Sequence, residues 1–145
     1  MSTPKGKNIL IVDDDEDVTK LFETFLEYDG YNVDAFTDPI NALYSFRKNT
    51  YDLALLDLKM PKMNGIILSQ KLQNIDPTLL FRFITANKEY IEFLKKNNPN
   101  IEKFVIYKPI WLNELKSKVH LLLLNQQQKK DKDKLLMLVW PISRM

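Results

Sequence analysis

The chain has 145 residues, of which 45% are hydrophobic and 28% are charged. This balance suits one globular domain with a core of ordinary size, and it excludes a fully disordered chain. The absence of cysteine excludes disulfides, thiolate nucleophiles and Cys-based metal sites, and a net charge of +2 is too balanced to argue for nucleic-acid binding.

Strand and helix signals alternate from the start of the chain. Residues 7–12 (KNILIV) form an apolar run typical of a strand that is buried on both faces, and apolar residues at helical spacing follow over residues 15–28. Residues 31–36 alternate as YNVDAF, which predicts a second strand nearer a sheet edge. Asp38 followed by proline begins a second helix, since proline suits the first helical position, and residues 53–56 are a third buried strand.

After a loop at residues 60–65, the second half of the chain repeats this alternation. The elements that we predict there are a helix at 66–74, a strand at 78–84, a helix at 87–97, a strand at 104–107 and a helix beginning near Trp111. Five βα units in strict alternation predict an α/β fold, with a parallel sheet covered by five helices on its two faces. Five strands suit the flavodoxin-like, doubly wound order 2-1-3-4-5.

The two ends of the chain carry no targeting signal that we recognise. The first residues lack the apolar segment of a signal peptide, and no apolar stretch approaches the roughly 20 residues of a membrane span, so we expect a cytoplasmic protein. Residues 1–125 are expected to form the domain. Residues 126–134 are polar and form a solvated helix extension or a linker. A short apolar tail with Trp140 completes residues 126–145, in which we expect no second domain.

Five polar residues stand where the predicted apolar strands end. They are Asp13, Asp14, Asp57, Thr85 and Lys108. In open parallel sheets ligands bind beyond the carboxyl ends of the strands, so these side chains are expected to meet at one edge of the sheet. In the order above, the three acids would be immediate neighbours at the switch point, with the hydroxyl and the ammonium beside them.

Three clustered carboxylates indicate a metal site. They cannot all stay ionised without a counter-charge, and Mg²⁺ takes oxygen ligands from one or two carboxylates plus a phosphate. We expect Asp14 and Asp57 as direct ligands, with Asp13 acting directly or through water. The backbone carbonyl of Lys59 would complete the shell.

The remaining groups fit phosphoryl transfer. The Asp57 carboxylate can act as a nucleophile and form an acyl phosphate. Lys108 would supply a point charge, and Thr85 a hydroxyl donor, for two phosphoryl oxygens. Each residue alone has a structural explanation, such as a helix cap, a turn or a surface lysine. Their joint placement at successive strand ends favours the functional interpretation.

Four motifs resemble a known family. ILIVDDDEDV, LLDLKMPKMNG, ITA and YKPI together resemble the receiver domain of two-component response regulators, over about residues 7–124. The resemblance implies that Asp57 is the phosphoacceptor, supplied by a histidine kinase or phosphotransfer protein with Mg²⁺. It implies that Asp13 and Asp14 are the acidic pair, and that Thr85 and Lys108 are the switch hydroxyl and the lysine. The Lys108–Pro109 peptide is often cis in such domains.

The chain departs from the family at the switch aromatic. The family places an aromatic residue three positions before the lysine, where this chain has Val105. Whether Phe104 or Tyr107 replaces it is open, and Tyr107 is expected to point to the opposite side from the usual switch residue. Lys59 and Asn87 occupy the two positions that tune dephosphorylation in this family.

The resemblance implies a stand-alone signalling switch, with no enzymatic activity beyond self-phosphorylation and autodephosphorylation. Its partner would bind the face of the fourth helix, fifth strand and fifth helix, and a homodimer is left open. One alternative is a phosphorylation-independent scaffold. Another is a phosphohydrolase, although Lys59 stands where haloacid-dehalogenase-like enzymes carry a second acid. We expect His120 at the surface or partly packed, and Trp111 packed at the start of the fifth helix.

Overall fold

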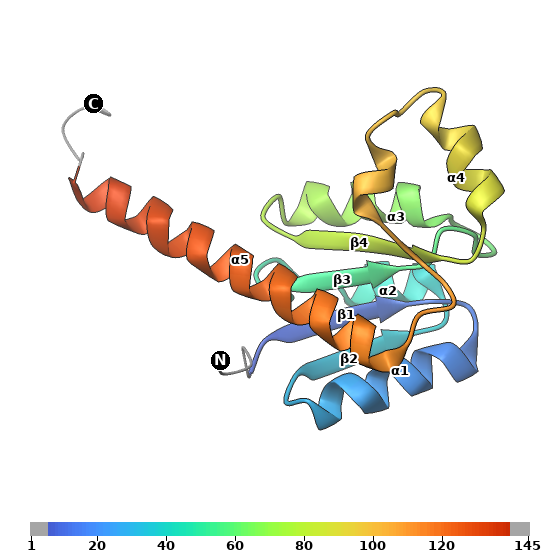
Figure 1. Cartoon of the computed structure of the whole chain (residues 1–145), viewed down its shortest axis with the longest axis horizontal. Helices are drawn as coiled ribbons and strands as arrows, with labels where there is room; N and C mark the ends of the chain where they lie inside the picture. The colour runs from blue at the N-terminus through green and yellow to red at the C-terminus, as the bar shows by residue number, and fades with distance from the viewer. Residues whose placement is uncertain (1–5, 140–145) are drawn as a thin grey trace.

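The alternation of strands and helices extends along the whole described part of the chain (Figure 1). The computed structural model describes residues 6–139, with the backbone alone for residues 131–139. The elements are β1 (Asn8–Val12), α1 (Glu16–Tyr28), β2 (Asn32–Phe36), α2 (Pro39–Ser45), β3 (Leu53–Leu56), α3 (Gly65–Ile75), β4 (Leu80–Thr85), α4 (Lys88–Lys95), the 3₁₀ turn η1 (Ile101–Phe104), β5 (Val105–Tyr107) and α5 (Leu112–Val139). The predicted tail around Trp140 lies outside the described residues.

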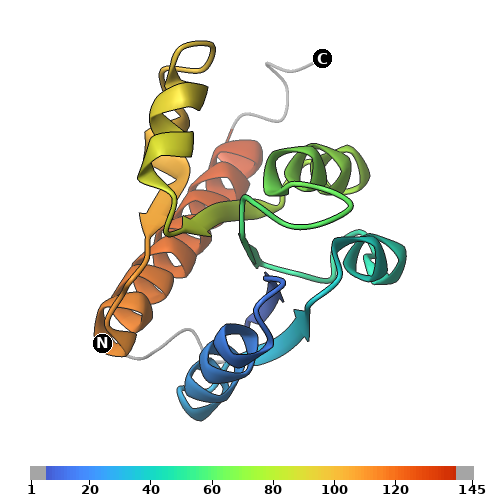
Figure 2. The ribbon, with the colours of Figure 1, turned by 90° about the vertical axis from the view of Figure 1, so that its right-hand side faces the viewer.

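The five strands form one parallel sheet in the order β2-β1-β3-β4-β5, which confirms the predicted flavodoxin-like topology. All four residues of β3 are buried, and so is β1 from Ile9 onward, as their continuous apolar runs predict. The alternating strand β2 lies at an edge. Helices α1 and α5 cover one face and α2 and α3 the other, as the end-on view in Figure 2 shows. The carboxyl ends of the strands therefore share one rim.

Local capping accounts for several polar residues at the helix starts. The Asp15 carboxylate accepts hydrogen bonds from the amides of Asp17 and Val18 at the start of α1. The Asn87 side chain caps α4 in the same way. Asp15 and Asn87 are therefore the N-caps of α1 and α4. Helix capping does not explain why Asp13 and Thr85 stand at their positions.

Several element boundaries differ from the prediction by one or two residues, and three of them show why. Strand β4 begins at Leu80 rather than at residue 78, because the amide and hydroxyl of Thr78 both bond to the Asp76 carboxylate in a turn. Helix α4 ends at Lys95, two residues early. The 3₁₀ turn η1 takes Phe104, so that β5 begins only at Val105.

Helix α5 continues through the polar segment 126–134 and extends well past the sheet (Figure 1). No helix in the described part of the chain is long and apolar enough to span a membrane. The expected packing of Trp111 is wrong, since its side chain is 83% exposed. Its backbone carbonyl instead accepts the amide of Leu115 in the first turn of α5. His120 is half-buried on α5, as expected.

Candidate functional site

The carboxyl ends of β1, β3, β4 and β5 surround a pocket of about 460 Å³. All five residues predicted from the strand ends line it: Asp13, Asp14, Asp57, Thr85 and Lys108. Lys59, Ala86 and Asn87 complete the rim, together with the α1 cap Asp15. The tertiary fold thus brings together groups from four strands that are scattered over about a hundred positions.

Three carboxylates converge in this pocket. Asp13, Asp14 and Asp57 each offer an oxygen, and the three oxygens lie within 4.8 Å of one another. Asp13 is buried, whereas Asp14 is exposed. One Asp13 oxygen accepts the amide of Asp15 at 2.9 Å, and the other accepts the Lys108 ammonium at 2.6 Å. The cluster therefore carries one internal counter-charge for three acids.

The electrostatics of Asp57 reflect that imbalance. Burial raises the pKa of the Asp57 carboxyl, the nearby charge of Asp13 adds to the increase, and Lys108 partly offsets it; the resulting pKa is about 7. One Asp57 oxygen accepts the amide of Leu58 at 2.9 Å. An all-oxygen donor set with more negative than positive charge fits a hard dication such as Mg²⁺.

Lys108 is held in place through its backbone. Its amide donates to the carbonyl of Thr85 at 2.8 Å, and the following peptide bond to Pro109 is cis. Thr85 is buried, and its hydroxyl oxygen accepts the amide of Asn87 at 3.1 Å. Thr85 lines the pocket, where its hydroxyl is free to donate to a phosphoryl oxygen.

Gly65 ends the LLDLKMPKMNG motif, but the sequence alone assigned it no role. In the structure it positions the backbone of Asp57. A Cβ at Gly65 would lie 2.1 Å from the carbonyl oxygen of Asp57, and the Gly65 amide donates to the carbonyl of Leu58 at 2.8 Å. Only glycine allows α3 to approach the Asp57 backbone this closely. The available signal was a glycine eight residues after the strand-end acid Asp57.

Tyr107 corrects one expectation. Tyr107 does not point away from the usual switch position, because side chains two residues apart in a strand share a face, and both Val105 and Tyr107 pack on the α3–α4 side of the core. Tyr107 is also the direct register partner of Thr85 in β4. The aromatic ring next to the threonine is thus supplied two positions later than in the family pattern. Phe104 instead stacks on Phe81.

Two lysine–tyrosine contacts connect α4 with its neighbours: one with Lys59 at the pocket rim, the other with β5. The Lys88 ammonium lies 5.6 Å from the ring centre of Tyr107, and that of Lys59 lies 5.2 Å from the ring centre of Tyr90. Tyr90 belongs to α4, and Lys59 follows Asp57 by two residues. A change at the pocket therefore has two direct contacts through which it can reach α4 and β5.

Known proteins match this chain over most of its length. The family model of the response regulator receiver domain matches residues 9–120. Response regulator ArlR of Staphylococcus saprophyticus is 31% identical over 83% of this chain, and the receiver protein CpdR of Brucella abortus is 31% identical over 81%. The match covers 54% of ArlR but 98% of CpdR, so the chain spans about half the length of some curated relatives.

The fold agrees with these matches. A CheY-like receiver domain from Methanospirillum hungatei superposes with a TM-score of 0.73 at 27% identity, covering 86% of this chain and 99% of that one. Receiver domains are signalling switches rather than classical enzymes; they accept phosphoryl groups from sensor kinases and generally bind Mg²⁺ at an acidic pocket. The chain belongs to the receiver-domain family of two-component response regulators.

Proposed function

We propose that this chain is a phosphorylation-dependent switch in which Asp57 accepts a phosphoryl group from a histidine kinase. The observation that supports this most directly is the convergence of Asp13, Asp14 and Asp57 beside the Lys108 ammonium in one open pocket. Asp14 and Asp57 would hold Mg²⁺ directly, Asp13 would act directly or through water, and the backbone carbonyl of Lys59 would add a ligand. When bound, Mg²⁺ supplies the positive charge that keeps Asp57 ionised and neutralises the incoming phosphoryl group.

The chemical step is a displacement at phosphorus. An oxygen of the Asp57 carboxylate forms the new P–O bond, and the P–N bond to the donor imidazole breaks with its electron pair going to that nitrogen. Lys108 exchanges part of its contact with Asp13 for a phosphoryl oxygen. The Thr85 hydroxyl donates to another oxygen. Small phosphodonors serve the same reaction, and water attack at phosphorus later returns the free carboxylate.

Transmission runs through α4. Movement of Thr85 toward the phosphoryl group opens space beside its neighbour Tyr107, and the Tyr107 ring carries Lys88 with it. The face made by α4, β5 and α5 then changes shape. Its exposed Phe93 (60%) offers apolar area to a downstream protein. Only a partner with different affinity for the two states reads the switch.

The test is phosphorylation of the full chain with acetyl phosphate and Mg²⁺, read by intact mass. We expect one added phosphoryl group in the native protein, none in Asp57→Asn, and little without Mg²⁺. Asp52→Asn is the matched control, since it removes a carboxylate at the amino ends of the strands. Modification that survives Asp57→Asn would contradict the proposal. Equal partner binding with and without phosphate would favour the scaffold alternative.

We further propose three properties of this switch. Its domain ends near residue 125, and residues 126–139 continue its last helix, α5. The protein works in the cytoplasm, where a kinase can supply phosphoryl groups derived from ATP. The direct output is binding to a protein, with no contact to nucleic acid.

A further inference from the structure

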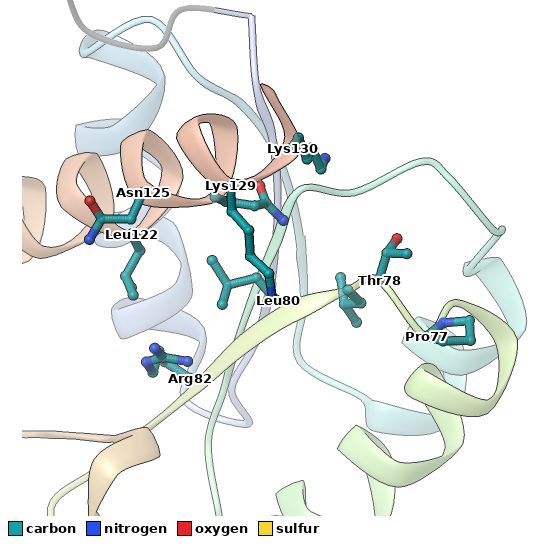
Figure 3. Close-up of a pocket in the computed structure, with 10 residues that line it drawn as sticks. Pro77, Thr78, Leu80, Arg82, Leu122, Asn125, Lys129 and Lys130 are labelled. Carbon is teal, nitrogen blue, oxygen red and sulfur yellow. The ribbon is translucent and has the colours of Figure 1, made fainter. Parts of the chain in front are cut away.

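A second groove lies at the opposite end of β4 from the phosphorylation pocket. It has a volume of about 550 Å³ and lies between the start of β4 and the middle of α5 (Figure 3). Its principal lining residues are Leu80, Arg82, Leu122, Asn125, Gln126 and Lys129. A further hollow of about 250 Å³ shares Arg82, Leu122 and Asn125 with it and is also lined by Lys103 of η1 and Lys118 of α5. The two hollows adjoin at these shared residues, and neither has an acidic residue in its lining.

The environment of Arg82 is the main indication that this groove binds a ligand. Its guanidinium donates to the carbonyl of Phe81 at 2.7 Å and lies 5.4 Å from the ring centre of Phe104. Among the described residues, no carboxylate lies within ion-pair distance of it. Burial lowers the pKa of the Arg82 guanidinium, yet an arginine keeps its charge. A half-buried cation without an anion is ready to receive one.

Other groove residues specify more of the ligand. Figure 3 shows the Lys129 side chain reaching from α5 toward β4, on the same side as Arg82. Leu80 and Leu122 supply an apolar floor.

We propose that this groove binds an acidic peptide segment of a partner protein. An acidic peptide carries both complementary groups: a carboxylate for Arg82 and Lys129, and an apolar side chain for Leu80 and Leu122. Two adjoining hollows suit an extended chain better than a compact ligand. No aromatic ring lines the main groove to stack on a nucleotide base. The site is separate from the phosphorylation pocket, so either proposal can fail without the other.

The test is fluorescence anisotropy with the full, unphosphorylated chain and two labelled peptides of equal negative charge. One alternates glutamate with leucine, and the other alternates glutamate with glycine. We expect tighter binding of the first peptide, because only it uses the apolar floor. Arg82→Gln should weaken that binding about tenfold, the effect of losing one charge-assisted contact. Lys129→Gln, an exposed position that does not affect folding, should weaken it severalfold.

Lys20→Gln is the matched control, because it removes the same charge from the exposed face of α1. Equal losses in Lys20→Gln and Lys129→Gln would show attraction by net charge alone and overturn the site. Equal affinity for the two peptides would show that the apolar floor is not used, and this too would overturn the proposed site. Saturable binding of ATP that displaces the peptide and depends on Arg82 would assign the groove to a nucleotide instead.

Discussion

The Lys108 ammonium donates to a carboxylate oxygen of Asp13 across 2.6 Å, although the two residues are 95 positions apart in the chain. The contact joins the loop after β5 to the end of β1 and encloses the phosphorylation pocket between them. Asp13 is 4% exposed, so this is a largely desolvated ion pair. Such pairs contribute little relative to apolar residues, but the loss of one partner is costly because a buried charge remains.

Replacement of Lys108 by methionine should therefore destabilise the protein. We expect a loss of about 3 kcal/mol in the free energy of unfolding at pH 7, since Asp13 keeps its burial without its counter-ion. The loss should shrink in acid, where the carboxylates are protonated. Urea unfolding followed by circular dichroism measures this. Lys20→Met, on the exposed face of α1, should change stability by less than about 0.5 kcal/mol. A similar loss in both variants would mean that the ion pair has no special role.

The raised pKa of Asp57 predicts a specific dependence of stability on pH. The pKa of about 7 in the folded state exceeds the ordinary aspartate pKa of 3.8, so between these values the folded state holds more protons than the unfolded state. This group's contribution to stability is therefore complete below about pH 4 and is lost as the pH rises through 7. In Asp57→Asn the side chain cannot ionise, so this decrease in stability with rising pH is absent. Without divalent metal at pH 8, the variant should be more stable by about 1–2 kcal/mol, with solvent screening allowed for. Parallel pH profiles for the two proteins would contradict this.

Magnesium should stabilise the native chain through the acid cluster. A ligand that binds only the folded state adds about 2.7 kcal/mol at a hundredfold excess over its dissociation constant. We expect the rise in Tm with Mg²⁺ to be larger at pH 8 than at pH 6, because the metal requires the deprotonated Asp57. Asp14→Asn should remove most of the rise, and Glu27→Gln on α1 should leave it intact. Addition of a chelator should reverse the stabilisation.

The contact between Gly65 and Asp57 predicts that alanine is not tolerated at this position. A Cβ would overlap the carbonyl of Asp57, so Gly65→Ala should cost about 2 kcal/mol and displace the phosphoacceptor. The rate of phosphorylation by acetyl phosphate should fall with it. Asn64→Ala tests the neighbouring position: it removes the cap of α3 at a cost of about 1 kcal/mol but should leave that rate unchanged. Equal rates in all three proteins would show that the close approach is not required.

Tyr107 should carry the switch signal to α4. Tyr107→Leu removes the ring next to Thr85 and the contact with Lys88. We expect the variant to bind beryllofluoride as the native protein does, but to show amide chemical-shift changes in α4 at least about twofold smaller, because one of two contacts is lost. Tyr44→Leu, an exposed tyrosine on α2, should behave as the native chain does. Undiminished changes in α4 would assign the transmission to the Lys59–Tyr90 contact instead.

The sequence by itself determined the strand order and the residues that share one rim. The apolar runs at β1 and β3 indicated buried strands. The alternation of strands and helices, with right-handed crossovers, then placed Asp13, Asp57 and their partners at the carboxyl ends of a parallel sheet. Boundaries were less accurate where a side chain competes for the backbone. Thr78 bonds to Asp76 and delays β4, which no periodicity shows.

Only the tertiary structure decided the relations between elements. The exposure of Trp111, the pairing of Tyr107 with Thr85 and the need for glycine at position 65 depend on which atoms meet across neighbouring segments. The same holds for Arg82. The sequence shows only a charged residue within a β-strand, and it is the packing of α5 beside β4 that places this residue in a groove. Local patterns specify which face of an element is buried, but long-range distances, and hence ion pairs and grooves, arise only when the elements pack.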